Sequence, residues 1–236
     1  MNRDQMQQGI ILAVSGKLGS GKDTIASLVM AEMDSRSITQ VSFAGALRCE
    51  VNQIIEIISQ SQNLSSARVE VANSLLAENV AEVVEALYPL VKDGVVSSSD
   101  QRHPSVRLVL QLWGTEVRRT QNPDYWVDLA LKKIRAAVEN NTNVVITDAR
   151  YENEIQALQK HGAMILRLDI SPEVQAQRIL LRDGHPPLLS AISHKSELSL
   201  DDWSFPARVN VDRLSVAEVV HESLRVLGKR RILLNF

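Results

Sequence analysis

Residues 10–24 form the most informative stretch of the chain and read Ile10-Ile11-Leu12-Ala13-Val14-Ser15-Gly16-Lys17-Leu18-Gly19-Ser20-Gly21-Lys22-Asp23-Thr24. The apolar run at 10–14 predicts a short strand that is buried on both faces, as in a parallel sheet. Residues 22–33 place apolar side chains at helical spacing, at Ile25, Leu28, Val29 and Met33. A glycine-rich turn therefore connects a buried strand to a helix.

That turn, residues 16–22, matches the pattern G-x-x-x-x-G-K, and we call it the phosphate loop. Glycines let the backbone curl so that several N–H groups face one anion, and the following helix directs its positive end at the same place. The closing lysine then reaches the terminal phosphates of a nucleoside triphosphate. We expect ATP to be bound by Gly16, Lys17, Gly19, Ser20, Gly21, Lys22, Asp23 and Thr24.

Asp23 stands where Ser or Thr more often contacts magnesium in this pattern, and Thr24 follows it. A carboxylate is a natural ligand for Mg²⁺, so Asp23 and Thr24 are the expected metal ligands. The alternative is that Asp23 only stabilises the positive end of the helix.

Length and composition set the class of protein. The chain has 236 residues, 44% of them apolar, which is enough for a substantial core. A formal net charge of −2 gives no whole-surface reason to expect nucleic acid or an anionic membrane as partner. The single cysteine, Cys49, excludes an intrachain disulfide and suits the cytoplasm, and its apolar surroundings predict a buried thiol. We expect no signal peptide and no membrane span.

Short apolar strands alternate with helices along the rest of the chain. Strands are predicted at 37–43, 143–148, 163–169 and 207–211, and helices at 44–58, 65–87, 105–120, 123–139, 152–161, 172–182 and 215–227. We expect Ser65 and Ser215 to cap two of these helices. Residues 183–206 are rich in Pro, Ser and His, lack periodicity and predict a lid. The alternation predicts an α/β protein with a parallel, five-stranded sheet between layers of helices.

Charged residues follow the strands and helices at positions where ligands bind in open parallel sheets. Asp148 and Arg150 follow the strand at 143–148, and Arg178 and Arg182 lie one helical turn apart before the lid. Arginine suits the clamping of phosphoryl oxygens because its guanidinium is planar and always charged. Single helix arginines are as often merely solvated.

Four stretches of the chain resemble the deoxynucleoside monophosphate kinases of large bacteriophages, a group of P-loop kinases. They are residues 15–24, 43–48 (Phe43-Ala44-Gly45-Ala46-Leu47-Arg48), 111–127 (Gln111-Leu112-Trp113-Gly114-Thr115-Glu116 on to Tyr125-Trp126-Val127) and Asp148-Ala149-Arg150 with Glu154. A fifth, His194-Lys195-Ser196-Glu197, is similar to a His-x-Ser/Thr-Glu element near the lid of that group. The resemblance implies one P-loop kinase domain over 1–236, a helical acceptor-binding region at 44–140 and a lid segment at 178–206.

The resemblance also implies roles for individual residues. ATP and Mg²⁺ would be the cofactors, and catalysis would rest on Lys22, Asp23, Arg150, Arg178 and Arg182. The acceptor would be bound by Ala44, Arg48, Arg107, Gln111, Gly114, Thr115, Arg119, Trp126, Asp148, Arg150 and Glu154. The choice between Arg118 and Arg119 stays open, and Trp126 could instead be ordinary core. The apolar stripe at 65–87 leaves a homodimer possible, and a phage protein of this kind would work in the host cytoplasm.

The hypothesis is therefore transfer of the terminal phosphoryl group of ATP to a deoxynucleoside monophosphate, a small-molecule substrate. Two alternatives stay open: a P-loop kinase of another small molecule, such as a coenzyme precursor or a mevalonate phosphate, and a non-catalytic nucleotide-binding module.

Overall fold

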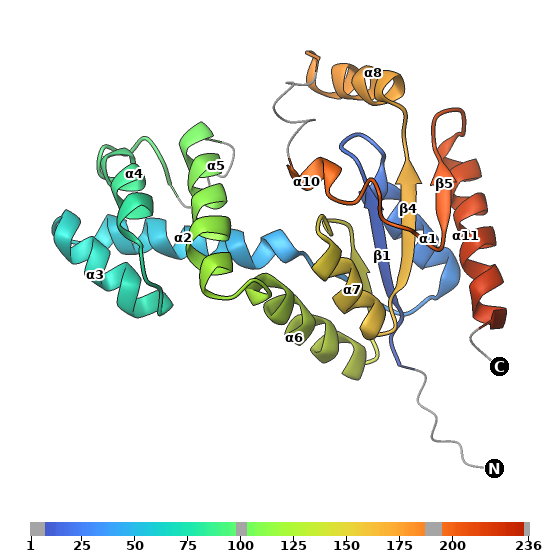
Figure 1. Ribbon diagram of the computed structural model, residues 1–236, viewed down its shortest axis with the longest axis horizontal. Coiled ribbons are helices and arrows are strands. Elements are labelled where there is room, and N and C mark those ends of the chain that lie inside the picture. Colours follow the sequence, from blue (N-terminus) through green and yellow to red (C-terminus); the bar gives the residue numbers. More distant parts are fainter. Residues whose placement is uncertain (1–7, 98–102, 187–194, 234–236) are drawn as a thin grey trace, which may run out of the picture. The chain divides into compact units, whose positions relative to one another are not determined.

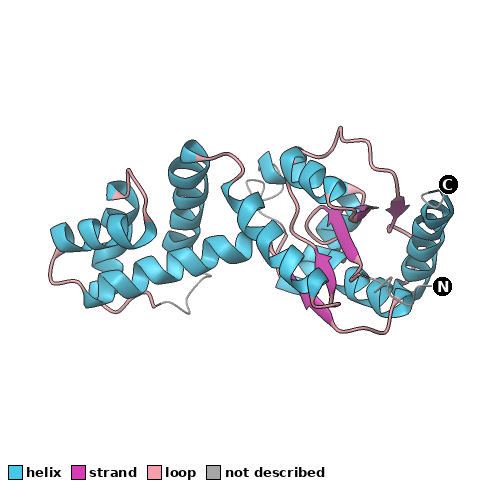
Figure 2. Ribbon diagram, turned by 90° about the horizontal axis from the view of Figure 1, so that it is seen from below, coloured by secondary structure: helices cyan, strands magenta, loops and turns pink. Residues whose placement is uncertain are grey.

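The computed structural model describes residues 8–97, 103–186 and 195–233. The chain folds as two compact units. The sheet unit comprises Met1–Ser42 and Leu131–Phe236, and the helical unit comprises Phe43–Ala130. Figure 2 shows that the strands belong to the sheet unit. None of the described helices is long and apolar enough to cross a membrane.

The sheet unit is built on a five-stranded sheet whose order is β2-β3-β1-β4-β5 (Figure 1). The strands are β1 (Ile11–Gly16), β2 (Ile38–Gln40), β3 (Asn143–Ile146), β4 (Met164–Asp169) and β5 (Arg208–Asn210), and every pairing is parallel. The prediction of a parallel, five-stranded α/β sheet is confirmed. Strand β1 lies at its centre, so the phosphate loop emerges at the middle of the carboxyl edge.

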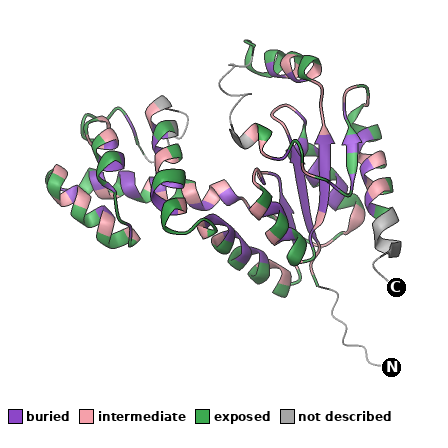
Figure 3. Cartoon of the chain, in the orientation of Figure 1, coloured by how far each residue is buried: buried purple, intermediate pink, exposed green. Residues whose placement is uncertain are grey.

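Helices cover both faces of the sheet. Helices α1 (Lys22–Met33) and α11 (Val216–Leu233) contact each other and share a core with the strands. That core contains Leu12, Val14, Ile25, Val29, Leu166, Leu168, Val209 and Val219. Helix α7 (Glu152–Lys160) packs against β4 on the other face (Figure 1). The central strands are buried along most of their length (Figure 3), as expected for a sheet covered on both sides.

The helical unit has its own apolar core around α2 (Phe43–Gln60), α3 (Leu64–Leu75), α4 (Ala81–Lys92) and α5 (Pro104–Gln111). Helix α5 runs into a π-helical segment, η1 (Leu112–Arg119), and α6 (Tyr125–Glu139) follows. In the sheet unit, α8 (Pro172–Asp183) and α10 (Lys195–Leu198) complete the described elements.

Several predicted boundaries are wrong. The helix expected at 65–87 is two helices, because Leu76 and Asn79 adopt left-handed conformations with φ of 48° and 56°. The cap of the first is Asn63, not Ser65. The strand expected at 37–43 ends at Gln40. The thiol of Cys49, which was expected to be buried, is exposed. The Ser215 cap is confirmed by its exchange of hydrogen bonds with Glu218.

Candidate functional site

The phosphate loop has the geometry that its glycines suggested. Gly19 and Gly21 adopt left-handed conformations, with φ of 81° and 82°. A Cβ atom on Gly16 would lie 2.4 Å from the Ser20 Oγ and 3.0 Å from the Leu168 carbonyl oxygen, so only glycine fits there. No side chain caps α1, so the first N–H groups of the helix face the loop without a side-chain acceptor. This arrangement is suited to an anion.

A cavity of about 300 Å³ opens on this loop. It is lined by Leu18, Gly19, Gly21, Lys22, Asp23, Thr24, Arg178 and Arg182. The fold thus brings the predicted ATP-binding loop and the two arginines of α8 to one cavity. Its volume and its cationic side chains fit a polyphosphate.

Lys22 lines this cavity and is only 8% exposed. Its Nζ donates a long hydrogen bond, 3.5 Å, to the Lys17 carbonyl oxygen. Burial lowers the pKa of this ammonium group, and the nearby positive charge of Arg150 lowers it further, while Asp23 and Glu197 act in the opposite direction. Lys22 is therefore a poorly solvated cation, which an incoming phosphate would stabilise.

Asp23 is held by the end of β3. The Thr147 hydroxyl donates to the Asp23 carboxylate, and the Gln40 amide donates to the Thr147 Oγ at 3.2 Å. Asp23 and Thr24 both line the cavity and offer oxygen ligands. Among the described residues there is no cluster of three or more His, Cys, Asp or Glu side chains that could hold a metal alone. The donor set fits Mg²⁺, which is usually held by one or two protein oxygens together with substrate phosphates.

The turn after β3 carries the remaining predicted residues of the sheet unit. The Ser42 hydroxyl donates to the Asp148 carboxylate. Arg150 forms an ion pair with Glu197 on α10. Glu154 is buried, and its Oε2 accepts from the backbone N–H groups of Arg150 and Tyr151 at 2.7 and 3.1 Å. Glu154 thus fixes the turn that carries Arg150, and direct contact of Glu154 with a substrate stays a prediction.

The two arginines of α8 differ in their surroundings. Arg178 donates to the carbonyl oxygens of Gly19, at 3.4 Å, and Val211, at 2.8 Å, so it links α8 to the phosphate loop. Arg182 is exposed and pairs with its neighbour Asp183 at 2.7 Å. Of the lid segment predicted at 178–206, residues 187–194, including His194, lie outside the described part.

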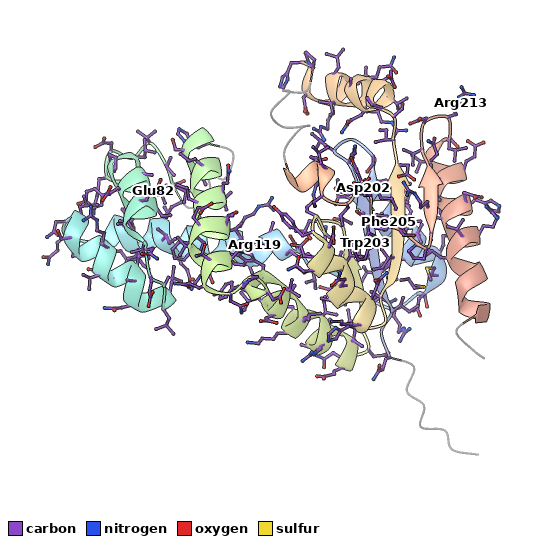
Figure 4. The ribbon with its side chains drawn as sticks, in the orientation of Figure 1. Glu82, Arg119, Asp202, Trp203, Phe205 and Arg213 are labelled. Carbon is purple, nitrogen blue, oxygen red and sulfur yellow. The ribbon has the colours of Figure 1, made fainter. Side chains whose placement is uncertain are left out.

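In the helical unit, the structure separates Arg118 from Arg119. Arg118 is buried, and its guanidinium donates to Glu50 at 2.8 Å and to the Leu75 carbonyl oxygen at 2.8 Å. The guanidinium also lies 4.9 Å from the Trp113 ring and 4.5 Å from that of Tyr125. Arg118 is a core residue, whereas Arg119, labelled in Figure 4, is half-buried according to its accessible surface. Arg119 is therefore the better candidate to contact a ligand.

The other acceptor-binding candidates of the helical unit lie on α2, α5, η1 and α6. Arg48, Gln111 and Thr115 are exposed, and Ala44 is half-buried; Arg107 lies in α5, and its side chain is outside the described part. Trp126 is 3% exposed and donates its indole N–H to the Gly114 carbonyl oxygen at 3.1 Å. A Cβ atom on Gly114 would lie 3.1 Å from the Leu47 Cδ2, so η1 packs closely on α2 there. Trp126 is part of the core, and its contribution to a pocket stays a prediction.

A sequence comparison with protein families identifies a relationship. The family model described as deoxynucleotide monophosphate kinase matches residues 44–178, which is more than half of the chain. The chain belongs to this family. It is therefore a kinase, a phosphotransferase that binds nucleotides, and the resemblance seen in the sequence motifs is confirmed.

The comparison with solved structures gives only a general likeness. A gluconokinase from Sinorhizobium meliloti 1021 aligns with a TM-score of 0.48 and 17% identity, over 96% of this chain and 96% of that one. The tunicamycin resistance protein of Deinococcus radiodurans aligns with a TM-score of 0.47 and 15% identity, over 94% and 96%. No curated protein matches the chain significantly. These likenesses carry no inference on substrate.

Sequence reasoning gave no role to four side chains that shape the site of this member of the deoxynucleotide monophosphate kinase family. The Thr147 hydroxyl donates to Asp23 and the Gln40 amide donates to Thr147, and no local sequence signal indicated these contacts. Asp201 accepts from Lys17 at 2.8 Å and from Arg167 at 3.2 Å, which ties the segment after α10 to the phosphate loop. Glu197 contacts both this loop and Arg150. Only Glu197 had a signal, the His-x-Ser-Glu motif.

Proposed function

We propose that the chain transfers the γ-phosphoryl group of ATP to a deoxynucleoside monophosphate and releases ADP and a deoxynucleoside diphosphate. The family supports a nucleotide kinase. The observation that carries the proposal is the cavity on the phosphate loop, in which a buried lysine, two oxygen ligands and two arginines converge. Such a convergence of donors suits a triphosphate whose terminal group is being transferred.

In the proposed reaction, an oxygen of the acceptor's phosphate forms a bond to the γ-phosphorus, and the bond from that phosphorus to the β,γ-bridging oxygen breaks. The acceptor oxygen is already anionic, so no strong general base is needed. Magnesium, when bound near Asp23 and Thr24, supplies positive charge to the β- and γ-phosphates. Lys22 and the loop N–H groups hold the donor, while Arg150, Arg178 and Arg182 offset the charge that moves during transfer.

The helical unit is the proposed site of acceptor recognition. Its exposed or half-buried candidates, Arg48, Gln111, Thr115 and Arg119, come from three elements of that unit. Guanidinium groups can bind the acceptor's phosphate in a bidentate way, and amide or hydroxyl groups can recognise a base.

The test is an ADP-release assay with ATP·Mg²⁺ and each deoxy- and ribonucleoside monophosphate in turn, with a mevalonate phosphate and a sugar as further acceptors. The expected result is turnover of at least one deoxynucleotide, lost in Lys22→Ala while far-UV circular dichroism stays unchanged. Glu32→Gln, an exposed change on the same helix, is the matched control. Turnover of a non-nucleotide alone, or ATP binding with no acceptor-dependent ADP release, would refute the proposal.

A further inference from the structure

Glu197 joins the two sets of charged groups in the sheet unit. It lies on α10, and its side chain is only 8% exposed. Its Oε2 accepts the Leu18 backbone N–H at 2.8 Å, inside the phosphate loop. Its Oε1 pairs with the guanidinium of Arg150. One carboxylate therefore contacts both the loop that holds the donor and an arginine that is predicted to face the acceptor.

Arg150 is held by its backbone as well as by its side chain. Its N–H donates to the Glu154 Oε2 at 2.7 Å. Its carbonyl oxygen accepts from the hydroxyl of Ser199, two residues after Glu197. Since the same short segment contacts the backbone and the guanidinium of Arg150, a displacement of that segment would move the arginine.

A second anchor fixes the segment on the phosphate loop. Asp201 accepts from Lys17 at 2.8 Å and from Arg167, a buried arginine on β4, at 3.2 Å. The neighbouring Asp202 is exposed, and Figure 4 shows it on the stretch between α10 and β5 together with Trp203 and Phe205. Residues 197–201 thus form a bracket, by which we mean a segment with contacts to both the phosphate loop and the turn of Arg150.

The bracket also has an electrostatic role. Glu197 contacts the phosphate loop through the Leu18 N–H and pairs with Arg150, and the buried cation of Lys22 closes that same loop. Like charges at short range repel strongly where burial excludes water. Glu197 supplies the negative charge that offsets the guanidinium of Arg150 beside the loop before a phosphate binds.

We propose that Glu197 is a positioning residue for phosphoryl transfer, which holds the Arg150 guanidinium beside the phosphate loop and neutralises its charge there. This inference rests on the proposed function for the role of Arg150. It makes a distinctive prediction for Glu197→Gln. Glutamine keeps one oxygen for the Leu18 N–H but removes the charge that holds Arg150. Binding of the anionic donor should then improve, while turnover should fall.

The test is a double-mutant cycle in the full-length protein with Glu197→Gln, Arg150→Met and both together, and with Asp202→Asn as matched control. Calorimetric titration gives the Kd for ATP·Mg²⁺, and ADP release gives kcat and KM for the accepted deoxynucleotide. We expect Glu197→Gln to bind ATP a few-fold more tightly and to lose about tenfold to a hundredfold in kcat, the size of effect seen when a catalytic group is misplaced. In the Arg150→Met background, the further loss in kcat should be less than about twofold. Asp202→Asn should match the unmodified protein.

Two results would overturn the proposal. One is weaker or unchanged ATP binding by Glu197→Gln, because a merely structural lesion impairs donor binding as well as turnover. The other is a loss in kcat that multiplies with that of Arg150→Met, because Glu197 would then act independently of the arginine. ATP affinity is measured without an acceptor. Absence of turnover with every deoxynucleotide would therefore refute the proposed function. The Kd values for ATP·Mg²⁺ would still show whether Glu197 balances the charge of Arg150 beside the phosphate loop.

Discussion

Arg118 and Arg119 are adjacent in the sequence, and the structure predicts opposite consequences of replacing them. Arg118→Ala removes the guanidinium that pairs with Glu50 at 2.8 Å and donates to the Leu75 carbonyl oxygen. Removal of one partner of a buried pair costs about 3–5 kcal/mol. Because Trp113 and Tyr125 still donate to Glu50, we expect the lower end, about 3 kcal/mol. With a urea m value of about 2 kcal/mol/M, the unfolding midpoint should fall by about 1.5 M.

The assay is urea unfolding followed by tryptophan fluorescence, since Trp113 and Trp126 are both buried in the helical unit. Arg119→Ala should unfold within about 0.5 kcal/mol of the unmodified protein and raise KM for the acceptor about tenfold or more. Glu82→Ala, an exposed change on α4 (Figure 4), is the control and should change neither quantity. A loss of less than about 1 kcal/mol in Arg118→Ala, or equal losses in the two arginine variants, would refute this reasoning.

Three further predictions concern single groups. Burial lowers the pKa of Lys22 in the folded chain below its ordinary value of 10.5, so the charged lysine lowers stability at neutral pH. Lys22→Met should therefore raise the melting temperature at pH 7. This gain should shrink as the pH approaches 10.5, because the lysine of the folded chain then loses its proton. Burial and then the Glu50 carboxylate raise the pKa of Tyr125 to about 12. The difference in ultraviolet absorbance between the protein and Tyr125→Phe should therefore show ionisation of the phenol near that pH. Glu50→Gln should lower the pKa of this phenol. Thr147→Val removes the hydroxyl that holds the Asp23 carboxylate and should raise the Mg²⁺ concentration needed for half-maximal ADP release, with kcat at saturating Mg²⁺ less affected; an unchanged requirement would show that Thr147 does not position Asp23.

The parts of the fold that depend on local sequence could be predicted well. Strand β1, the phosphate loop and α1 follow one another within 23 residues, and each has a local signal: an apolar run, glycines and a helical stripe. Helix α1 has the predicted bounds. The same holds for the Ser215 cap, which needs only Glu218 three residues later.

The parts that depend on distant contacts could not be predicted. The periodicity at 65–87 continues through Leu76 and Asn79, whose left-handed conformations divide it, and only packing within the helical unit decides such a break. The sequence does not distinguish Arg118 from Arg119, because Glu50, whose carboxylate holds Arg118 in the core, lies 68 positions away. The short helix α10 has no periodic signal, and it is defined by contacts of Glu197 with residues far earlier in the chain.

The charges around Lys22 include the carboxylate of the aspartate that follows it. Burial and then the charge of Arg150 lower the pKa of Lys22, and the carboxylates of Asp23 and Glu197 both act to raise it. The two carboxylates have different partners, since Thr147 holds Asp23 whereas Arg150 and the Leu18 N–H hold Glu197. We propose that a phosphate bound by the loop would take over the balancing of Lys22, which would leave Asp23 beside a polyanion and make a divalent cation its natural partner. On the same proposal, Glu197 would keep its contact with Arg150, so donor binding would change the role of one carboxylate and leave the other to orient the arginine.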